Sequence, residues 1–126
     1  MTVQVRGSII RTVMISVVYA LIEAYYVNLS YGGGVVSPYH ALVFLIGLIA
    51  GSDRNVKVWV ANVLLYSVLE DDLFWAFTFQ LPSQWDPMYV VIGQGHFPIY
   101  YVPFLSMAMI LYVKGLREEE NAEETD

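Results

Sequence analysis

The sequence predicts an all-α polytopic membrane protein, a bundle of four transmembrane helices whose N- and C-termini both lie in the cytoplasm. The first observation behind this prediction is composition, because apolar residues make up 57% of the 126 residues and charged residues only 14%. Ordinary soluble domains contain about 45–50% apolar and about 25% charged residues. The other two observations are four long apolar segments and a one-sided distribution of basic residues.

The composition also excludes several classes of protein. A disordered chain has low hydrophobicity, which is the opposite of what is found here. The absence of cysteine excludes a disulfide scaffold and a cysteine-ligated metal site. A net charge of −6 with six Lys and Arg residues argues against a nucleic-acid partner. The expected partner is the lipid bilayer of the cell membrane, with other membrane subunits or further copies of the chain as open alternatives.

Four segments are predicted to cross the membrane and to form one domain over residues 1–117. A helix needs about 20 mainly apolar residues to cross a hydrocarbon core of about 30 Å. The segments cover about residues 8–29, 36–52, 56–80 and 97–116. The fourth contains Pro103, which predicts a kink because proline lacks the amide hydrogen of a helical bond. The short apolar stretch 88–93 is expected to lie in the membrane interface or to fold back over the bundle.

The basic residues give the orientation of these segments. With four crossings, all of them fall on one side of the membrane, namely Arg6, Arg11, Arg54, Lys57, Lys114 and Arg117. The opposite loops, about residues 30–37 and 82–96, contain neither Lys nor Arg. Because cytoplasmic loops are enriched in basic residues, both termini are predicted to be cytoplasmic. Residues 118–126 contain six acids and no base, and this composition predicts a disordered cytoplasmic tail.

Two glycines near the end of the second segment indicate close helix packing. Gly47 and Gly51 are four residues apart, the small-xxx-small spacing that allows helices to approach closely in membranes. We expect them to serve packing inside the bundle rather than a dimer face.

The ionisable residues inside the segments converge on the outer half of the bundle, although they are scattered along the chain. This group consists of Glu23, His40, Glu70, Asp71, Asp72 and His96. An acid at the centre of a transmembrane helix costs roughly 2.5–3.5 kcal/mol on insertion scales, so such residues indicate function. Buried acids must face a cavity, pair, protonate or bind a cation.

Helical periodicity selects among the acids of the third segment. At about 100° per residue, three consecutive acids spread over about 200° of a helix and cannot meet at one point. Glu70 continues a polar row with Asn62 and Tyr66 at intervals of four residues, whereas Asp72 continues an apolar row. We therefore expect Glu23, Glu70 and Asp71 to point into the bundle, and Asp72 to be the weaker candidate.

The residue types at this site favour a divalent metal ion such as zinc, iron or manganese. The predicted ligands are Glu23, His40, Glu70, Asp71 and His96, with Asp72 as a weaker candidate. Facing helices of four-helix bundles hold metals with glutamate and histidine in this way, although no local ligand motif is present. In a membrane metalloenzyme the cation would activate a water molecule. The candidate catalytic residues are Glu70, Asp71 and Tyr66.

Three other functions stay open at this point. His40 and His96 are candidate axial ligands of a haem group. The acids alternatively form the proton or cation pathway of a small transporter. In a third interpretation they pair with tyrosine hydroxyls or with basic residues of another subunit, which describes a non-enzymatic structural or assembly subunit. The sequence predicts a place for the site but neither its reaction nor its substrate.

Overall fold

The computed structural model describes residues 2–27, 38–79, 81 and 89–125, and over these ranges the chain is mostly helical. The described part contains helices α1 (Val3–Ile22), α2 (Pro38–Ala50), α3 (Val56–Phe77) and α4 (Tyr101–Thr125). A π-helical turn, η1 (Glu23–Val27), continues α1, and a hairpin of strands β1 (Tyr89–Ile92) and β2 (Gly95–Pro98) precedes α4. The predicted four-helix, mainly α-helical class is confirmed in this part of the chain.

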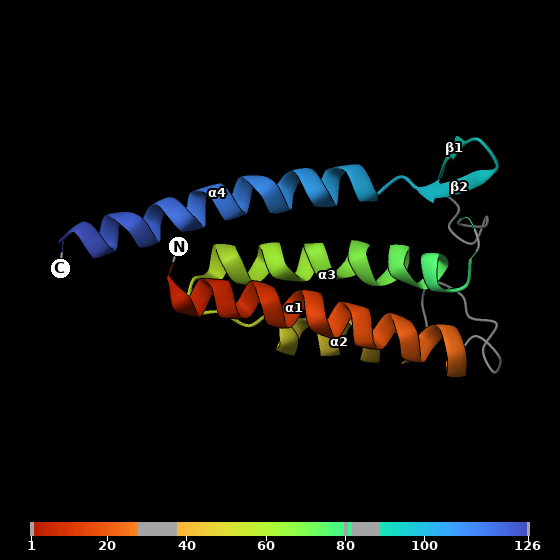
Figure 1. Ribbon diagram of the computed structural model, residues 1–126. Helices are drawn as coiled ribbons and strands as arrows, with labels where there is room; N and C mark the ends of the chain where they lie inside the picture. Colours follow the sequence, from red (N-terminus) through yellow and green to blue (C-terminus); the bar gives the residue numbers. More distant parts are fainter. Residues whose placement is uncertain (1, 28–37, 80, 82–88, 126) are drawn as a thin grey trace.

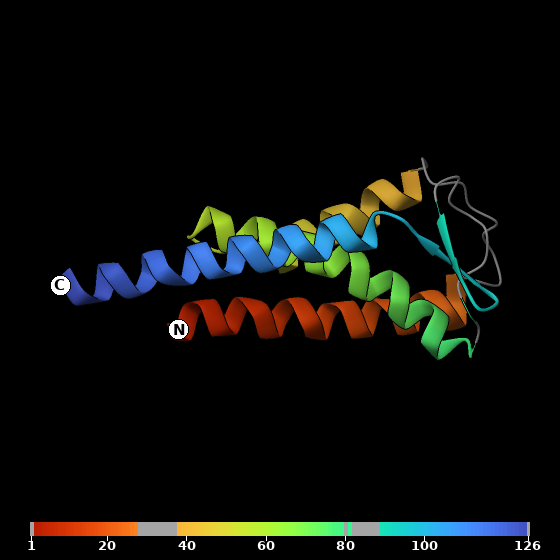
Figure 2. The same ribbon diagram turned by 90° about the horizontal axis from the view of Figure 1, so that it is seen from above.

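Helix α3 is the centre of the arrangement. Its most extensive contacts are with α4 and α1, and α2 packs against both α1 and α3 (Figures 1 and 2). The N-terminus and the C-terminus lie at one end of the molecule, while the β-hairpin lies at the other (Figure 1). The first and last helices therefore begin and end on the side predicted to be cytoplasmic.

The polarity of α1 is reversed relative to a helix of a soluble protein. Its buried residues are small or hydroxylated, namely Val5, Ser8, Thr12, Ser16 and Ala20. Large apolar side chains point outward instead, and Met14 is 60% exposed. The hydroxyls of Ser8, Thr12 and Ser16 donate to carbonyls of their own helix at 2.8–3.0 Å, so their polar groups are satisfied without a partner helix. Small side chains on this face allow α1 and α3 to pack closely.

Membrane-spanning capacity differs among the described helices. Judged by length and composition, the segment Val3–Tyr25 could cross a membrane, and His40–Ala50 is a shorter apolar helix. Helix α3 has 22 residues, but Glu70, Asp71 and Asp72 lie within it and lower its hydropathy. The four membrane spans thus stay a prediction.

The start of the fourth predicted segment differs from the expectation. Strands β1 and β2 pair antiparallel, with Tyr89 opposite Pro98 and Ile92 opposite Gly95. Gly93 begins the two-residue turn with φ of +62°, a conformation that glycine adopts without strain. The sequence predicts that the apolar stretch 88–93 folds back over the bundle or lies in the membrane interface. From residue 89 onward it forms a strand and the following turn, as its consecutive β-branched side chains favour.

The proline expected to kink the fourth helix lies in its first turn. Helix α4 begins at Tyr101 rather than near residue 97, so Pro103 is its third residue. An amide at this position would have no partner within the helix, and proline is tolerated there. Pro103 therefore gives no reason to expect a kink inside α4.

The acidic end of the chain is helical, where composition predicts a disordered tail. Helix α4 continues through residues 118–125 because Glu and Ala have high helix propensity. Lys57 forms an ion pair with Glu118, which fastens the last part of α4 to the start of α3. This hydrogen bond and the positive charge of the Lys57 ammonium lower the pKa of the exposed Glu118 carboxyl.

The glycines of α2 pack against α3, as expected for the interior of the bundle. A Cβ atom on Gly47 would lie 2.2 Å from Cδ1 of Tyr66. A Cβ atom on Gly51 would lie 2.8 Å from Cβ of Asn62. Each glycine thus leaves the space that one buried polar side chain of α3 occupies.

Candidate functional site

A pair of glutamates joins α1 to α3 in the half of the molecule away from the termini. The carboxyl groups of Glu23 and Glu70 lie within hydrogen-bonding reach of each other. Because an ionised carboxylate only accepts hydrogen bonds, a bond between two carboxyl groups requires a proton on one of them. A hydrogen bond within the pair would therefore require one bound proton.

Glu70 is the more deeply buried member of the pair, with 8% of the residue exposed. Its Oε1 atom has no hydrogen-bond partner within the described chain. Glu23 is half-buried and is the first residue of the π-helical turn η1. Single π-helical turns occur frequently at functional sites, since they change the direction of one side chain relative to the preceding helix. The pair thus combines burial, two neighbouring carboxyl groups and an oxygen atom that has no hydrogen-bond partner in the described chain.

Tyr66 lies one helical turn before Glu70, and its residue surface is 2% exposed. Its hydroxyl donates to the carbonyl oxygen of Val43 in α2 at 3.1 Å. The side chains of Glu70, Tyr19 and Glu23 lie close enough for their charges to act on this hydroxyl. Since its hydroxyl hydrogen is already used, Tyr66 positions α2 beside the glutamate pair in this arrangement.

The next two acids of α3 turn toward α4 rather than toward Glu23. The hydroxyl of Tyr101 donates a hydrogen bond to Oδ2 of Asp71. Asp72 also lies within hydrogen-bonding reach of Tyr101, and both aspartates are half-buried. The three consecutive acids therefore serve two different helix interfaces, as their spread around the helix predicts.

The histidines occupy other elements. His96 lies in β2, where its ring meets that of Tyr89 edge to face, with centroids 4.8 Å apart. His40 lies in the first turn of α2 and is half-buried. Across residues 2–27, 38–79, 81 and 89–125, no group of three or more His, Asp or Glu side chains could hold a metal ion. The structure brings together Glu23 and Glu70 of the predicted ligands, and the metal and haem centres stay predictions.

Asn62 is the polar junction of the opposite half of the bundle. It is fully buried, and its Nδ2 donates to Ser8 Oγ at 3.1 Å and to the Gly51 carbonyl at 2.9 Å. Its Oδ1 accepts a hydrogen bond from the Tyr112 hydroxyl at 2.6 Å. One amide thus connects α1, the end of α2 and α4 to α3.

The sequence pattern places Asn62, Tyr66 and Glu70 in one row but does not predict the contacts made by the tyrosines of α4. Tyr101 contacts Asp71, and Tyr112 contacts Asn62. A signal for the inward face of α4 does exist in the sequence. Its buried residues recur every seven positions, at Tyr101, Ala108 and Gly115.

Comparison of the chain with protein-family models, curated proteins and solved structures gives no match.

Proposed function

We propose that the chain is a small integral membrane protein of four transmembrane helices that carries protons or cations across the bilayer through the carboxyl pair of Glu23 and Glu70. In this proposal both termini lie in the cytoplasm and the pair lies in the outer half of the membrane. The observation that carries the proposal is the buried pair of neighbouring carboxyl groups, in which Oε1 of Glu70 has no hydrogen-bond partner in the described chain.

The outward-facing surface of the helices supports a membrane location. Large apolar side chains are exposed on each described helix, for example Met14 at 60%, Ile49 at 66% and Met109 at 65%. Soluble monomers rarely expose contiguous apolar surface of this kind, whereas lipid tails solvate it. Polar side chains such as Asn62 and Thr12 are instead buried between the helices.

The chemistry of the pair supports proton or cation carriage. Acids inside a membrane bundle mark ion pathways, because their cost is acceptable only where they protonate or pair. A carboxyl group that shares a proton with a second carboxyl can release it when the two groups separate. The basic residues lie near the other end of the helices, so a proton or a cation is the natural partner of the second charge.

The proposed topology predicts the labelling of single-cysteine variants. The chain contains no cysteine, so Gln94→Cys in the hairpin turn and Glu124→Cys in α4 would each carry one thiol. In intact cells, a membrane-impermeant maleimide is expected to label Gln94→Cys, and to label Glu124→Cys only after permeabilisation. Equal labelling of both variants before permeabilisation would contradict the topology.

Transport is tested with the purified protein in vesicles that contain a pH-sensitive dye. Under a potassium diffusion potential, wild-type vesicles are expected to change internal pH faster than protein-free vesicles. Glu70→Gln keeps the size and polarity of the side chain but cannot release a proton, so its flux is expected to fall to the protein-free rate. Glu120→Gln, an exposed residue of α4, is the matched control and should retain full flux. Unchanged flux in Glu70→Gln would refute the role of the pair.

A divalent metal ion is the second candidate, favoured by the unpartnered Oε1 atom of Glu70. Carboxylate oxygens bind zinc, iron and manganese, and the metalloenzyme interpretation uses the same residue. Elemental analysis of the protein purified for transport distinguishes the two candidates. A stoichiometric metal that is lost in Glu70→Gln favours the metal site, and its absence in wild-type protein with normal flux favours the proton.

A further inference from the structure

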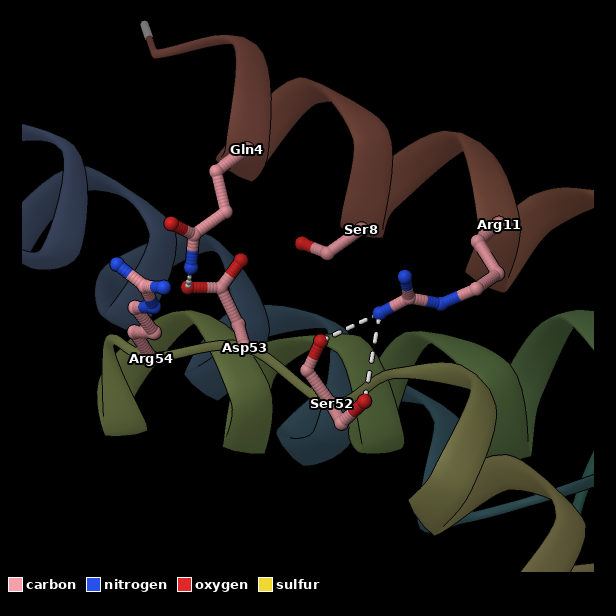
Figure 3. Close-up of a pocket in the computed structure, with 6 residues that line it drawn as sticks. All are labelled: Gln4, Ser8, Arg11, Ser52, Asp53 and Arg54. Carbon is pink, nitrogen blue, oxygen red and sulfur yellow. Dashed lines mark hydrogen bonds between the residues drawn. The ribbon is translucent and has the colours of Figure 1, made fainter.

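A polar cavity lies at the other end of the molecule, between the first half of α1 and the turn that joins α2 to α3. Its volume is about 320 Å³, and it is lined by Gln4, Ser8, Arg11, Ser52, Asp53 and Arg54 (Figure 3). Small-molecule sites have volumes of about 300–1,000 Å³. The cavity is therefore large enough for a small polar group, and it does not include the glutamate pair.

Two guanidinium groups lie at opposite ends of this cavity, with Asp53 between them (Figure 3). Arg11 is held in place, since its Nε donates to the Ala50 carbonyl at 2.6 Å and its Nη2 donates to the Ser52 carbonyl. Arg54 is exposed and has no ion pair with any residue whose position is described. Guanidinium groups bind phosphate with well-defined geometry, and a fixed one loses little conformational entropy on binding.

Asp53 provides a hydrogen-bond acceptor in the same cavity. Its Oδ1 accepts from the Asn55 amide at 2.9 Å and lies 3.5 Å from Nε2 of Gln4. Its Oδ2 is shielded from solvent and lacks a donor among the described residues. Leaving a buried carboxylate oxygen unsatisfied is costly, so this atom indicates a ligand that donates a hydrogen bond. A purely anionic ligand would be repelled at this position.

We propose that this cavity binds a head group that carries both a phosphate and a primary ammonium, as phosphoethanolamine does. The phosphate would bind Arg11 and the Ser52 hydroxyl, with Arg54 adding charge, and the ammonium would donate to Oδ2 of Asp53. Under the proposed topology the cavity lies at the cytoplasmic membrane surface, where phosphatidylethanolamine presents this chemistry. Soluble O-phosphorylethanolamine presents it as well.

The test measures binding of short-chain lipids to the detergent-purified, full-length protein by native mass spectrometry. Phosphatidylethanolamine is expected to bind about tenfold more tightly than phosphatidylcholine, whose quaternary ammonium has no N–H to donate. It is also expected to bind more tightly than phosphatidylglycerol, which lacks the amine. General electrostatic attraction would give the opposite order, since phosphatidylglycerol is the anionic lipid.

Variants assign the preference to individual residues. Asp53→Asn preserves shape and is expected to abolish the preference for phosphatidylethanolamine over phosphatidylglycerol. Arg54→Gln, an exposed change compatible with folding, is expected to weaken binding of all three lipids. Arg117→Gln removes the same charge from the exposed surface of α4, outside the cavity, and should leave the order unchanged.

Competition with O-phosphorylethanolamine distinguishes the two sources of the ligand. Displacement of the bound lipid shows that the head group alone suffices, and persistence of the lipid shows that the acyl chains contribute. Equal binding of the three lipids, or an equal effect of Arg54→Gln and Arg117→Gln, would overturn the proposal. These readouts measure binding rather than proton flux. Their result therefore does not depend on whether the glutamate pair carries protons.

Discussion

Replacing Asn62 by leucine is expected to destabilise the folded bundle by about 3 kcal/mol or more, because several buried groups lose their partner at once. Ser8 Oγ, the Gly51 carbonyl and the Tyr112 hydroxyl all form hydrogen bonds with this one side chain. Leucine cannot replace any of these bonds. A loss of this size is a large fraction of the total stability of about 5–15 kcal/mol that is typical of a domain.

The measurement is the loss of helical circular dichroism in detergent as sodium dodecyl sulfate is added. Asn121→Leu makes the same chemical change on the exposed end of α4 and should leave the transition unchanged. Tyr112→Phe removes one of the hydrogen bonds and should have an intermediate effect. If Asn62→Leu unfolded at the wild-type midpoint, Asn62 would not be the junction of the helices.

Gly47→Ala is expected to destabilise the bundle by about 1–3 kcal/mol through overpacking, although alanine is the better helix former. The added Cβ atom would lie 2.2 Å from the ring of Tyr66. That ring cannot easily move aside, because its hydroxyl is bonded to the Val43 carbonyl and the residue is buried. The clash must therefore separate α2 from α3.

Gly7→Ala is the matched control, since nothing lies within 4 Å of the Cβ atom added at that position of α1. The same substitution should stabilise the protein there by about 0.5–1 kcal/mol through higher helix propensity. The two variants are compared in the same detergent titration. Effects of equal sign at both positions would show that Gly47 acts through helix propensity rather than through contact with Tyr66.

Helical periodicity predicted which residues of α3 face inward. Asn62, Tyr66 and Glu70 recur at intervals of four and are all buried, because a row of that spacing stays on one face of a helix. It also predicted that the consecutive acids would separate, and Asp71 does turn toward α4. Periodicity gives no information on which other helix that face meets, so the contact with Tyr101 could not be predicted.

The hairpin, the helical acidic end and the cavity beside Asp53 could not be predicted from composition or periodicity. The sequence pattern places the end of β2 in the fourth span, since a short apolar stretch suits a strand or a helix end equally. The acidic residues from Glu118 onward were expected to be disordered, but the contact with Lys57 and helix propensity keep them helical. The cavity beside Asp53 arises from the shape of one turn, which a sequence pattern does not define.

The hydrogen bonds at the end of the bundle that holds the basic residues and the termini (the basic end) affect how the helices can move at the glutamate pair. Asn55 at the start of α3 donates to the Gly115 carbonyl of α4, and Arg11 binds the end of α2. These bonds fasten α3 to α4 and α1 to the end of α2. The helices can therefore rotate about this end. A small rotation of a helix about this end moves the opposite end of the helix by a larger distance. Gain or loss of a proton at Glu70 is therefore expected to change the separation of the outer helix ends while the basic end keeps its spacing.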